Sequence, residues 1–320
     1  MRAWYKTVTW LWVLAPLSGL FALISGLRRW LFRRGSKAVY RAPVPVIVVG
    51  NLTVGGNGKT PLVVWLVAWL RRQGYTPGVI SRGYGGKAEQ YPLLLKANTG
   101  PGQAGDEPVL IYRRTGCPVV VGPKRGEAAA LLATLGVDVI ISDDGLQHYA
   151  LARDIELVVV DGKRRFGNGH LLPMGPLREG LWRLKRVDAI INNGGPAETG
   201  EFLMTLKPGA LQPVGGTQAV PEPGETVNAL AGIGHPPRFF ATLEQLGFIL
   251  KQRLALADHK AVTPAQLTGL QSAPLLITEK DAVKWPGGHD NVWFVPVDAQ
   301  LPAEFEQLLL TRLKELDHGD

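Results

Sequence analysis

Short apolar runs alternate with longer amphipathic segments along most of the chain. In the first two thirds, these runs are bounded by glycine, proline or polar residues, as buried strands of a parallel sheet are. The segments between several of them have helical length, so the pattern predicts an open, doubly wound, mostly parallel α/β sheet. The predicted strands cover residues 44–49, 77–81, 118–121, 137–141, 155–160 and 187–191.

A second, smaller α/β unit is expected after residues 208–225, where proline, glycine, threonine and glutamine predict a linker or hairpin. Its strands are predicted at 229–233, 251–256, 274–278 and 292–295, with helices at 237–246 and 264–270. The pattern divides the chain into an N-terminal helix at 1–37, a larger core at 38–207, the linker, a smaller domain at 226–300, and a C-terminal helix at 301–320 that packs back on the body.

Residues 7–27 are uncharged and mostly apolar, which is long enough to cross a bilayer. Pro16 and a helical stripe of small and basic residues instead favour a helix lying at the membrane interface, although spanning stays open. A cleaved signal peptide is disfavoured because strongly basic residues follow the apolar run without a clear cleavage site. The stripe consists of Ser18, Ala22, Ser25, Gly26, Arg29 and Arg33.

The net charge of +8 belongs to the N-terminus. Residues 1–41 hold eight basic and no acidic residues, which leaves 27 basic against 27 acidic residues in the remainder. This distribution indicates contact with an anionic membrane surface rather than with nucleic acid, and it places the body on the cytoplasmic side if the helix spans. A single cysteine, Cys117, excludes an internal disulfide and a four-cysteine zinc site.

The segment after the first predicted strand carries the clearest chemical signal. A glycine-rich turn leads into Lys59, Thr60 and an apolar helix, which is the context of a phosphate-binding P-loop. Its backbone N–H groups would surround phosphates, Lys59 would reach the β- and γ-phosphates, and the Thr60 hydroxyl would face Mg²⁺. Thr53 departs from the usual pattern, which has glycine there. The predicted nucleotide-binding residues are Thr53, Val54, Gly55, Gly56, Asn57, Gly58, Lys59 and Thr60.

Asp143 and Asp144 follow the strand predicted at 137–141. An apolar strand that ends in aspartate downstream of a P-loop is the arrangement that holds Mg²⁺ in P-loop enzymes. We therefore expect a metal site formed by these carboxylates and Thr60, without deciding which aspartate touches the ion.

Other candidates lie in loops at the predicted carboxyl ends of strands, where open α/β sheets bind ligands. Asp106 ends a loop before a helix predicted to start at Pro108, and it is either a cap or a functional carboxylate. His148 is equally compatible with a structural and a site role. The remaining candidates are Arg82, Gln147, Arg178 and Glu179.

Taken in order, these motifs resemble the tetraacyldisaccharide 4'-kinase family, the lipid A 4'-kinases of Gram-negative bacteria, over nearly the whole chain. The motifs are residues 49–61, 81–84, 105–108, 143–148, 166–169, 175–179, 258–259 and 278–282. Thr53 matches the family's own form of the P-loop. Lys260 follows His259 where the family more often has an aromatic residue or a second histidine, and Gly234-His235 replaces the usual Ala-Asn.

The resemblance implies phosphorylation by ATP and Mg²⁺ of the 4'-hydroxyl of an acylated glucosamine disaccharide 1-phosphate, which yields lipid IV A. It also implies a location on the cytoplasmic face of the inner membrane, a P-loop NTPase-like core, and Asp106 and His259 acting as a dyad on the acceptor hydroxyl. The residue types agree with this implied reaction. An attacking alcohol needs a base, and phosphoryl transfer needs positive charge, which Lys59, Mg²⁺ and Arg178 would supply.

A P-loop switch or metallochaperone NTPase is the competing hypothesis. A P-loop with a nearby Asp-Asp pair suits it too, but it calls for neither a membrane anchor nor a separate Asp-His pair. Metal delivery would favour Cys/His clusters, which the sequence lacks.

Overall fold

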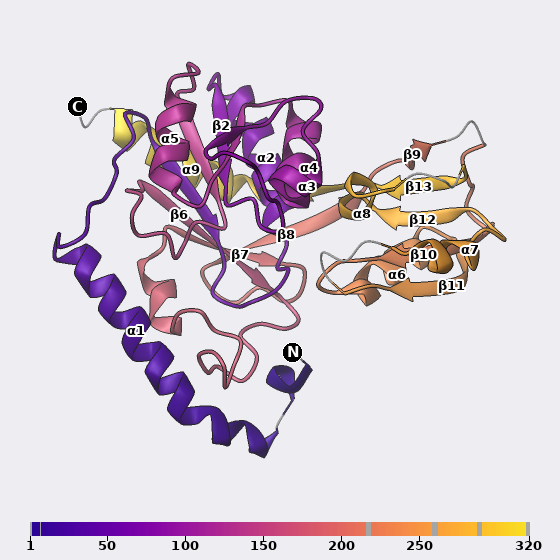
Figure 1. Cartoon of the computed structure of the whole chain (residues 1–320), viewed down its shortest axis with the longest axis horizontal. Coiled ribbons are helices and arrows are strands. Elements are labelled where there is room, and N and C mark those ends of the chain that lie inside the picture. The colour runs from indigo at the N-terminus through magenta and orange to yellow at the C-terminus, as the bar shows by residue number, and fades with distance from the viewer. Residues whose placement is uncertain (1, 7, 216–218, 258–261, 287–289, 318–320) are drawn as a thin grey trace.

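In the computed structural model, the chain is built around a nine-stranded sheet to which a smaller five-stranded sheet is joined at one end (Figure 1). The structure describes residues 2–6, 8–215, 219–257, 262–286 and 290–317.

The large sheet has the order β14-β8-β7-β6-β1-β5-β2-β4-β3. The strands from β8 to β4 run parallel, and only the edge strands β14 and β3 are antiparallel to their neighbours. The doubly wound, mostly parallel fold predicted from the apolar runs is therefore confirmed. The bounds are β1 Val46–Gly50, β2 Pro77–Ser81, β3 Leu93–Leu94, β4 Val119–Val121, β5 Val139–Asp143, β6 Ile155–Asp161, β7 Ala189–Asn193, β8 Glu201–Pro208 and β14 Val297–Gln300.

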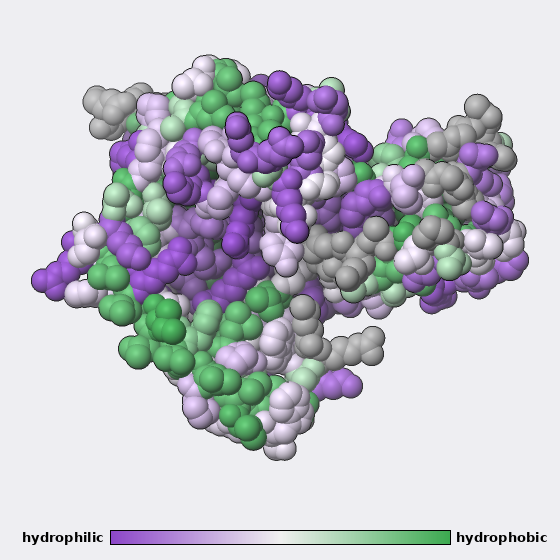
Figure 2. All heavy atoms as spheres, viewed as in Figure 1, coloured by the Kyte–Doolittle hydropathy of each residue, from purple (hydrophilic) through white to green (hydrophobic). Residues whose placement is uncertain are grey.

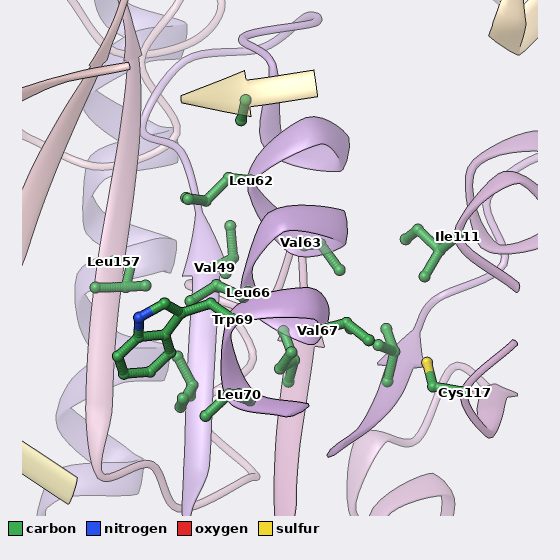
Figure 3. Packing of buried hydrophobic residues seen from close by; sticks show 14 of the residues in the cluster. Val49, Leu62, Val63, Leu66, Val67, Trp69, Leu70, Ile111, Cys117 and Leu157 are labelled. Atoms are coloured by element: carbon green, nitrogen blue, oxygen red, sulfur yellow. The ribbon is translucent and has the colours of Figure 1, made fainter. Parts of the chain in front are cut away.

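Helices cover both faces of this sheet. Helices α2 (Lys59–Arg72), α4 (Asp106–Thr115) and α9 (Ala303–Asp317) enclose one core, in which Trp69 stacks on Trp65. Leu66 and Trp69 of α2 lie against the sheet in this core (Figure 3). Helix α5 (Arg125–Ala133) covers a second core on the other face. Because β1 is buried on both faces, its run of valine and isoleucine has no polar interruption. The short helix α3 spans Pro101–Ala104, and a 3₁₀ helix spans Leu181–Arg186.

The smaller sheet has the order β11-β10-β12-β13-β9, with only β9 antiparallel, and helices pack on both of its faces. Strands β8 and β14, which the sequence pattern missed, pair with each other in the large sheet. The chain thus crosses between the sheets at 208–212 and 295–297, whereas the predicted smaller domain runs from 226 to 300. The bounds are β9 Gln212–Gly215, β10 Thr226–Ala231, α6 Pro236–Gln245, β11 Ile249–Ala255, α7 Pro264–Thr268, β12 Leu275–Thr278, α8 Glu279–Val283 and β13 Val292–Val295.

The N-terminal segment runs along the outside of the large domain (Figure 1). Two 3₁₀ helices, Arg2–Tyr5 and Thr9–Leu14, precede α1, which spans Ala15–Arg33. Within the described residues, Thr9–Arg33 is the one helical stretch long and apolar enough to cross a membrane, and little of it is buried in the body. The apolar band is visible as a green strip at the lower left of Figure 2.

Candidate active site

The P-loop leaves the carboxyl end of β1 and enters α2. Gly55 and Gly58 have φ angles of 107° and 89°, which lie in the left-handed region that side chains disfavour. A Cβ atom at Gly58 would also stand 2.0 Å from Nδ2 of Asn193, so glycine is required there on steric grounds as well. None of the backbone N–H groups of residues 55–58 donates a hydrogen bond to another described residue. These donors are therefore available to an anion.

The contacts of Thr53 explain why threonine stands where the common P-loop pattern has glycine. It is buried, and its Oγ1 accepts a hydrogen bond of 2.8 Å from Nδ2 of Asn57 across the loop. The next residue, Val54, donates its N–H to the carbonyl of Pro176 at 2.9 Å. The threonine thus braces the loop internally, while residues 176–178 hold it from outside.

Lys59, Asp144 and Arg178 form a charged triad in front of the P-loop. Nζ of Lys59 lies 3.3 Å from Oδ1 of Asp144, and the Arg178 guanidinium lies 3.1 Å from the same carboxylate. Burial alone would raise the pKa of Asp144, but the charges of Lys59 and Arg178 outweigh it and hold that pKa well below its ordinary value. Asp144 therefore stays ionised, as a metal ligand must.

Asp143 is buried more deeply than Asp144 and lies beside Val49 in the sheet register. Its Oδ2 accepts a hydrogen bond from Ser81 at 3.3 Å, while Oδ1 has no hydrogen-bond partner among the described residues. Burial, followed by the charge of Glu107, raises the pKa of Asp143 to about 7.

Mg²⁺ fits these side chains. Among the described residues, no group of three or more His, Cys, Asp and Glu is arranged as a metal site. Mg²⁺ at a P-loop does not need one, because it is commonly held by one or two carboxylates, water and substrate phosphates. The unpartnered Oδ1 of Asp143, the ionised Asp144 and the half-buried Thr60 supply suitable oxygen atoms.

Asp106 begins α4 and is buried, with Gly105 as its N-cap residue. Its Oδ1 accepts the N–H of Glu107 at 3.1 Å, and its Oδ2 lies 3.8 Å from both Lys280 and Lys284. These lysines belong to α8 of the small domain and the residue after it. Asp106 therefore lies at the interface of the two domains and is not a solvent-exposed cap. His259, its predicted partner, lies outside the described residues.

Gln147 and Glu179 belong to a second layer behind the triad. Nε2 of Gln147 donates to Glu179 at 3.3 Å, and Tyr149 also donates its hydroxyl to this buried carboxylate. Arg29 of α1 lies 3.7 Å from Glu179 and packs over the Trp182 ring. This set, which we call the Glu179 cluster, connects the N-terminal helix to the loop that carries Arg178.

The structure brings His148 and Arg82 to the same edge of the sheet. Arg82 is exposed, whereas His148 is half-buried, and the backbone N–H of His148 donates to the carbonyl of Gly145 in the turn after β5. Burial and then the charges of Arg125 and Arg82 lower the pKa of His148 to about 4, so the imidazole is neutral at pH 7.

A cleft of about 250 Å³ opens between the P-loop and the small domain. Its walls include Gly56 to Thr60 on one side and α6 on the other. Sequence reasoning missed several polar residues that line or support it, because each gains its meaning only when two distant segments meet. These residues are Asp161, Arg164, Asn193, His235, Arg238 and Lys280.

A parallel sheet with a glycine-rich loop after β1, a lysine at the start of α2 and paired aspartates at the carboxyl end of β5 defines a P-loop phosphotransferase fold. The model of the tetraacyldisaccharide-1-P 4'-kinase family matches residues 10–314. The chain belongs to this family, as the sequence motifs predicted, and is an enzyme of the kinase class.

Similar proteins match this chain over nearly its whole length. The tetraacyldisaccharide 4'-kinase of Aeromonas hydrophila is 59% identical over 316 residues, which cover 98% of this chain and 95% of that protein. The tetraacyldisaccharide 4'-kinase of Tolumonas auensis is 56% identical over 322 residues, covering 99% and 98%. A crystal structure of LpxK from Aquifex aeolicus in complex with ATP matches with a TM-score of 0.78 and 29% identity, covering 95% of this chain and all of that one.

Proposed function

We propose that the chain transfers the γ-phosphoryl group of ATP to the 4'-hydroxyl of an acylated glucosamine disaccharide 1-phosphate at the cytoplasmic face of the inner membrane. The observation that carries this proposal is the triad of Lys59, Asp144 and Arg178 placed against the P-loop. The O–P bond to ADP breaks, a new O–P bond forms at the sugar oxygen, and the hydroxyl proton leaves to a base.

The nucleotide lies in the cleft with its phosphates on the P-loop. Residues 55–58 present N–H groups, and Lys59 neutralises negative charge on the terminal phosphates. Apolar side chains that also line the cleft suit the adenine ring; they are Leu206, Ile233, Phe239, Val295 and Val297. Asp143, Asp144 and Thr60 would hold Mg²⁺, which when bound neutralises charge on the phosphates.

Asp106 is the proposed base for the acceptor hydroxyl, with His259 as its partner. The ammonium groups of Lys280 and Lys284 each lie 3.8 Å from Oδ2 of Asp106, so positive charge stands beside the carboxylate that would accept the proton. The proposed role of Arg178 is to stabilise negative charge on the transferred phosphoryl group; its position 3.1 Å from Asp144, which also lies beside Lys59, supports this role.

Helix α1 brings the enzyme to a substrate that stays in the bilayer. Most of its small and basic stripe faces the body, where Ser18 donates to the carbonyl of Leu171 at 2.7 Å and Arg29 lies 3.7 Å from Glu179, whereas Arg33 is exposed. The opposite face leaves large apolar residues exposed: Leu17, Leu20, Leu23, Ile24 and Leu27. Contacts along the length of α1 with a polar loop support attachment at the interface over spanning.

The test is direct. Purified full-length protein is incubated with ATP, Mg²⁺ and the tetraacyldisaccharide 1-phosphate in mixed micelles, and the lipid is analysed by mass spectrometry. We expect one added phosphate at the 4' position, little or none in the same time with Lys59→Ala, and normal product with the exposed Lys251→Ala as the matched control. ATP turnover that is independent of lipid and leaves the lipid unmodified would support the nucleotide-switch alternative instead.

A further inference from the structure

We propose that Arg238 of the small domain binds the terminal phosphates of the nucleotide from the side of the cleft opposite Lys59. This inference rests on the proposed function and adds a cation that comes from outside the core domain. Arg238 lies in the first turn of α6 and lines the same cleft as the residues of the P-loop.

The place of Arg238 is fixed next to the P-loop. Its NH2 donates to Oδ1 of Asn193 at 2.9 Å, and Nδ2 of the same amide donates to the carbonyl of Asn57 at 2.8 Å. The segment before α6 also lies against the P-loop, because a Cβ atom at Gly234 would stand 2.9 Å from the backbone nitrogen of Gly56. One amide side chain therefore separates the guanidinium from the loop that surrounds the phosphates.

Arg238 has no carboxylate partner within 4.0 Å among the described residues. The acidic residue whose charge acts on it most is Asp161, but both oxygens of Asp161 already bind Arg164 or backbone N–H groups of residues 163 and 164. Burial lowers the pKa of Arg238, yet an arginine stays charged at neutral pH. A half-buried cation without a direct carboxylate partner among the described residues, facing a cleft rich in N–H donors, suits a polyanion.

Arg164 differs from Arg238 in that its hydrogen-bond donors are already used within the protein. It is paired with Asp161 at 2.9 Å, and its NH2 donates to the carbonyl of Gly56 and, at 3.3 Å, to Oδ1 of Asn57. Its donors thus hold the P-loop, so Arg164 is a positioning residue. The donors of Arg238 other than the one on Asn193 make no hydrogen bond to a described residue and remain for a ligand.

Calorimetric titrations of the full chain with Mg²⁺-ATP, AMP and inorganic tripolyphosphate test the proposal. Arg238→Gln keeps an amide donor toward Asn193 but loses the charge, and should weaken ATP and tripolyphosphate by about tenfold or more. AMP should bind as it does to the wild type, and Arg238→Lys should recover part of the loss. Arg253→Gln removes the same charge from the exposed edge of the small domain and serves as the matched control.

The possible outcomes distinguish a failure of the proposed role of Arg238 from a failure of the proposed kinase function. If the wild type binds ATP and Arg238→Gln binds it equally well, the role of Arg238 is refuted while the kinase proposal stands. If Arg238→Gln loses AMP as strongly as ATP, or if Arg238→Lys behaves like Arg238→Gln with a lowered unfolding temperature, the arginine only supports the fold. A wild type that fails to bind ATP contradicts the proposed function itself.

Discussion

The ammonium of Lys59 and the carboxylate of Asp144 lie 3.3 Å apart, although one comes from the start of α2 and the other from the turn after β5. The pairing places the strongest predicted phosphate-binding cation next to a predicted metal ligand. Asp144 reaches this place with a φ angle of 48°, in the left-handed region that aspartate tolerates better than most residues.

Lys59→Ala should lower kcat for lipid phosphorylation by about a hundredfold or more, because it removes a charge that stabilises the transferred phosphoryl group. The measurement is the initial rate of product formation at saturating ATP, with Lys251→Ala as the control. A loss confined to KM for ATP would mean that Lys59 contributes only to binding.

Binding of Mg²⁺-nucleotide should release a proton from Asp143. Its pKa is raised to about 7, so the free protein carries much of the proton at pH 6, whereas a carboxylate that binds the metal must be ionised. Titration calorimetry in two buffers of different ionisation enthalpy should show about one proton released at pH 6 and little at pH 8.5. With Asp143→Asn the release should vanish; unchanged release would place the proton elsewhere.

The same carboxyl group predicts a pH dependence of stability without ligand. Between the ordinary pKa of 3.8 and about 7, the folded state holds a proton that the unfolded state has lost. The contribution of Asp143 to the free energy of unfolding therefore falls as pH rises through this window and is constant above it. The unfolding temperature of Asp143→Asn relative to wild type should rise from pH 4 to pH 7.5, and a constant difference would contradict the prediction.

Asp106→Asn should lower kcat by about two orders of magnitude or more if the carboxylate is the base for the acceptor hydroxyl. Asparagine keeps the shape and can still serve at a helix start, so near-normal rates would reduce Asp106 to a helix-starting residue. Glu107→Gln, which changes the neighbouring charge on the same helix, controls for a general electrostatic effect.

Lys284→Met removes one of the two ammonium groups that lie 3.8 Å from Asp106. We expect kcat for lipid phosphorylation to fall by about tenfold, because the proposed base loses one of its two neighbouring cations. Since Lys284 also lies 3.2 Å from Asp281, a lower unfolding temperature with unchanged kcat would indicate that it acts only through the packing of the small domain.

Replacing Leu20, Leu23 and Leu27 by glutamine should weaken binding to vesicles that contain anionic lipid by about a hundredfold or more. Nucleotide affinity should not change, since these side chains point away from the body. The exposed Ile249→Gln on β11 is the control. Deleting residues 1–37 is a less specific probe, because it also removes Arg29 from the Glu179 cluster.

The strands that deliver the site could be predicted because each is an apolar run buried on both faces. Val139–Asp143 shows this well, since the run itself points to the aspartates at its end. Strand β8 escaped prediction because it is only partly buried and begins with Glu201, whose charge is used by Arg165. Its short partner, β14, gains meaning only from pairing with β8.

The polar partners of the site were harder to foresee. Arg238 and Lys284 come from the small domain, far from the P-loop in sequence, and nothing local distinguishes them from surface cations. The stripe of Ser18 and Arg29 on α1 was recognised as one face, but only the structure shows that it packs on the body rather than meeting solvent. Such assignments need the tertiary contacts.

The contacts of Arg29 with Glu179 and Trp182 have a consequence for geometry at the bilayer. These side-chain contacts connect the N-terminal helix directly to the loop that carries Arg178. If α1 lies in the lipid surface, as we propose, these contacts set the height of the P-loop above the headgroups. A lipid substrate would then have to present its hydroxyl at that height, whatever the length of its acyl chains.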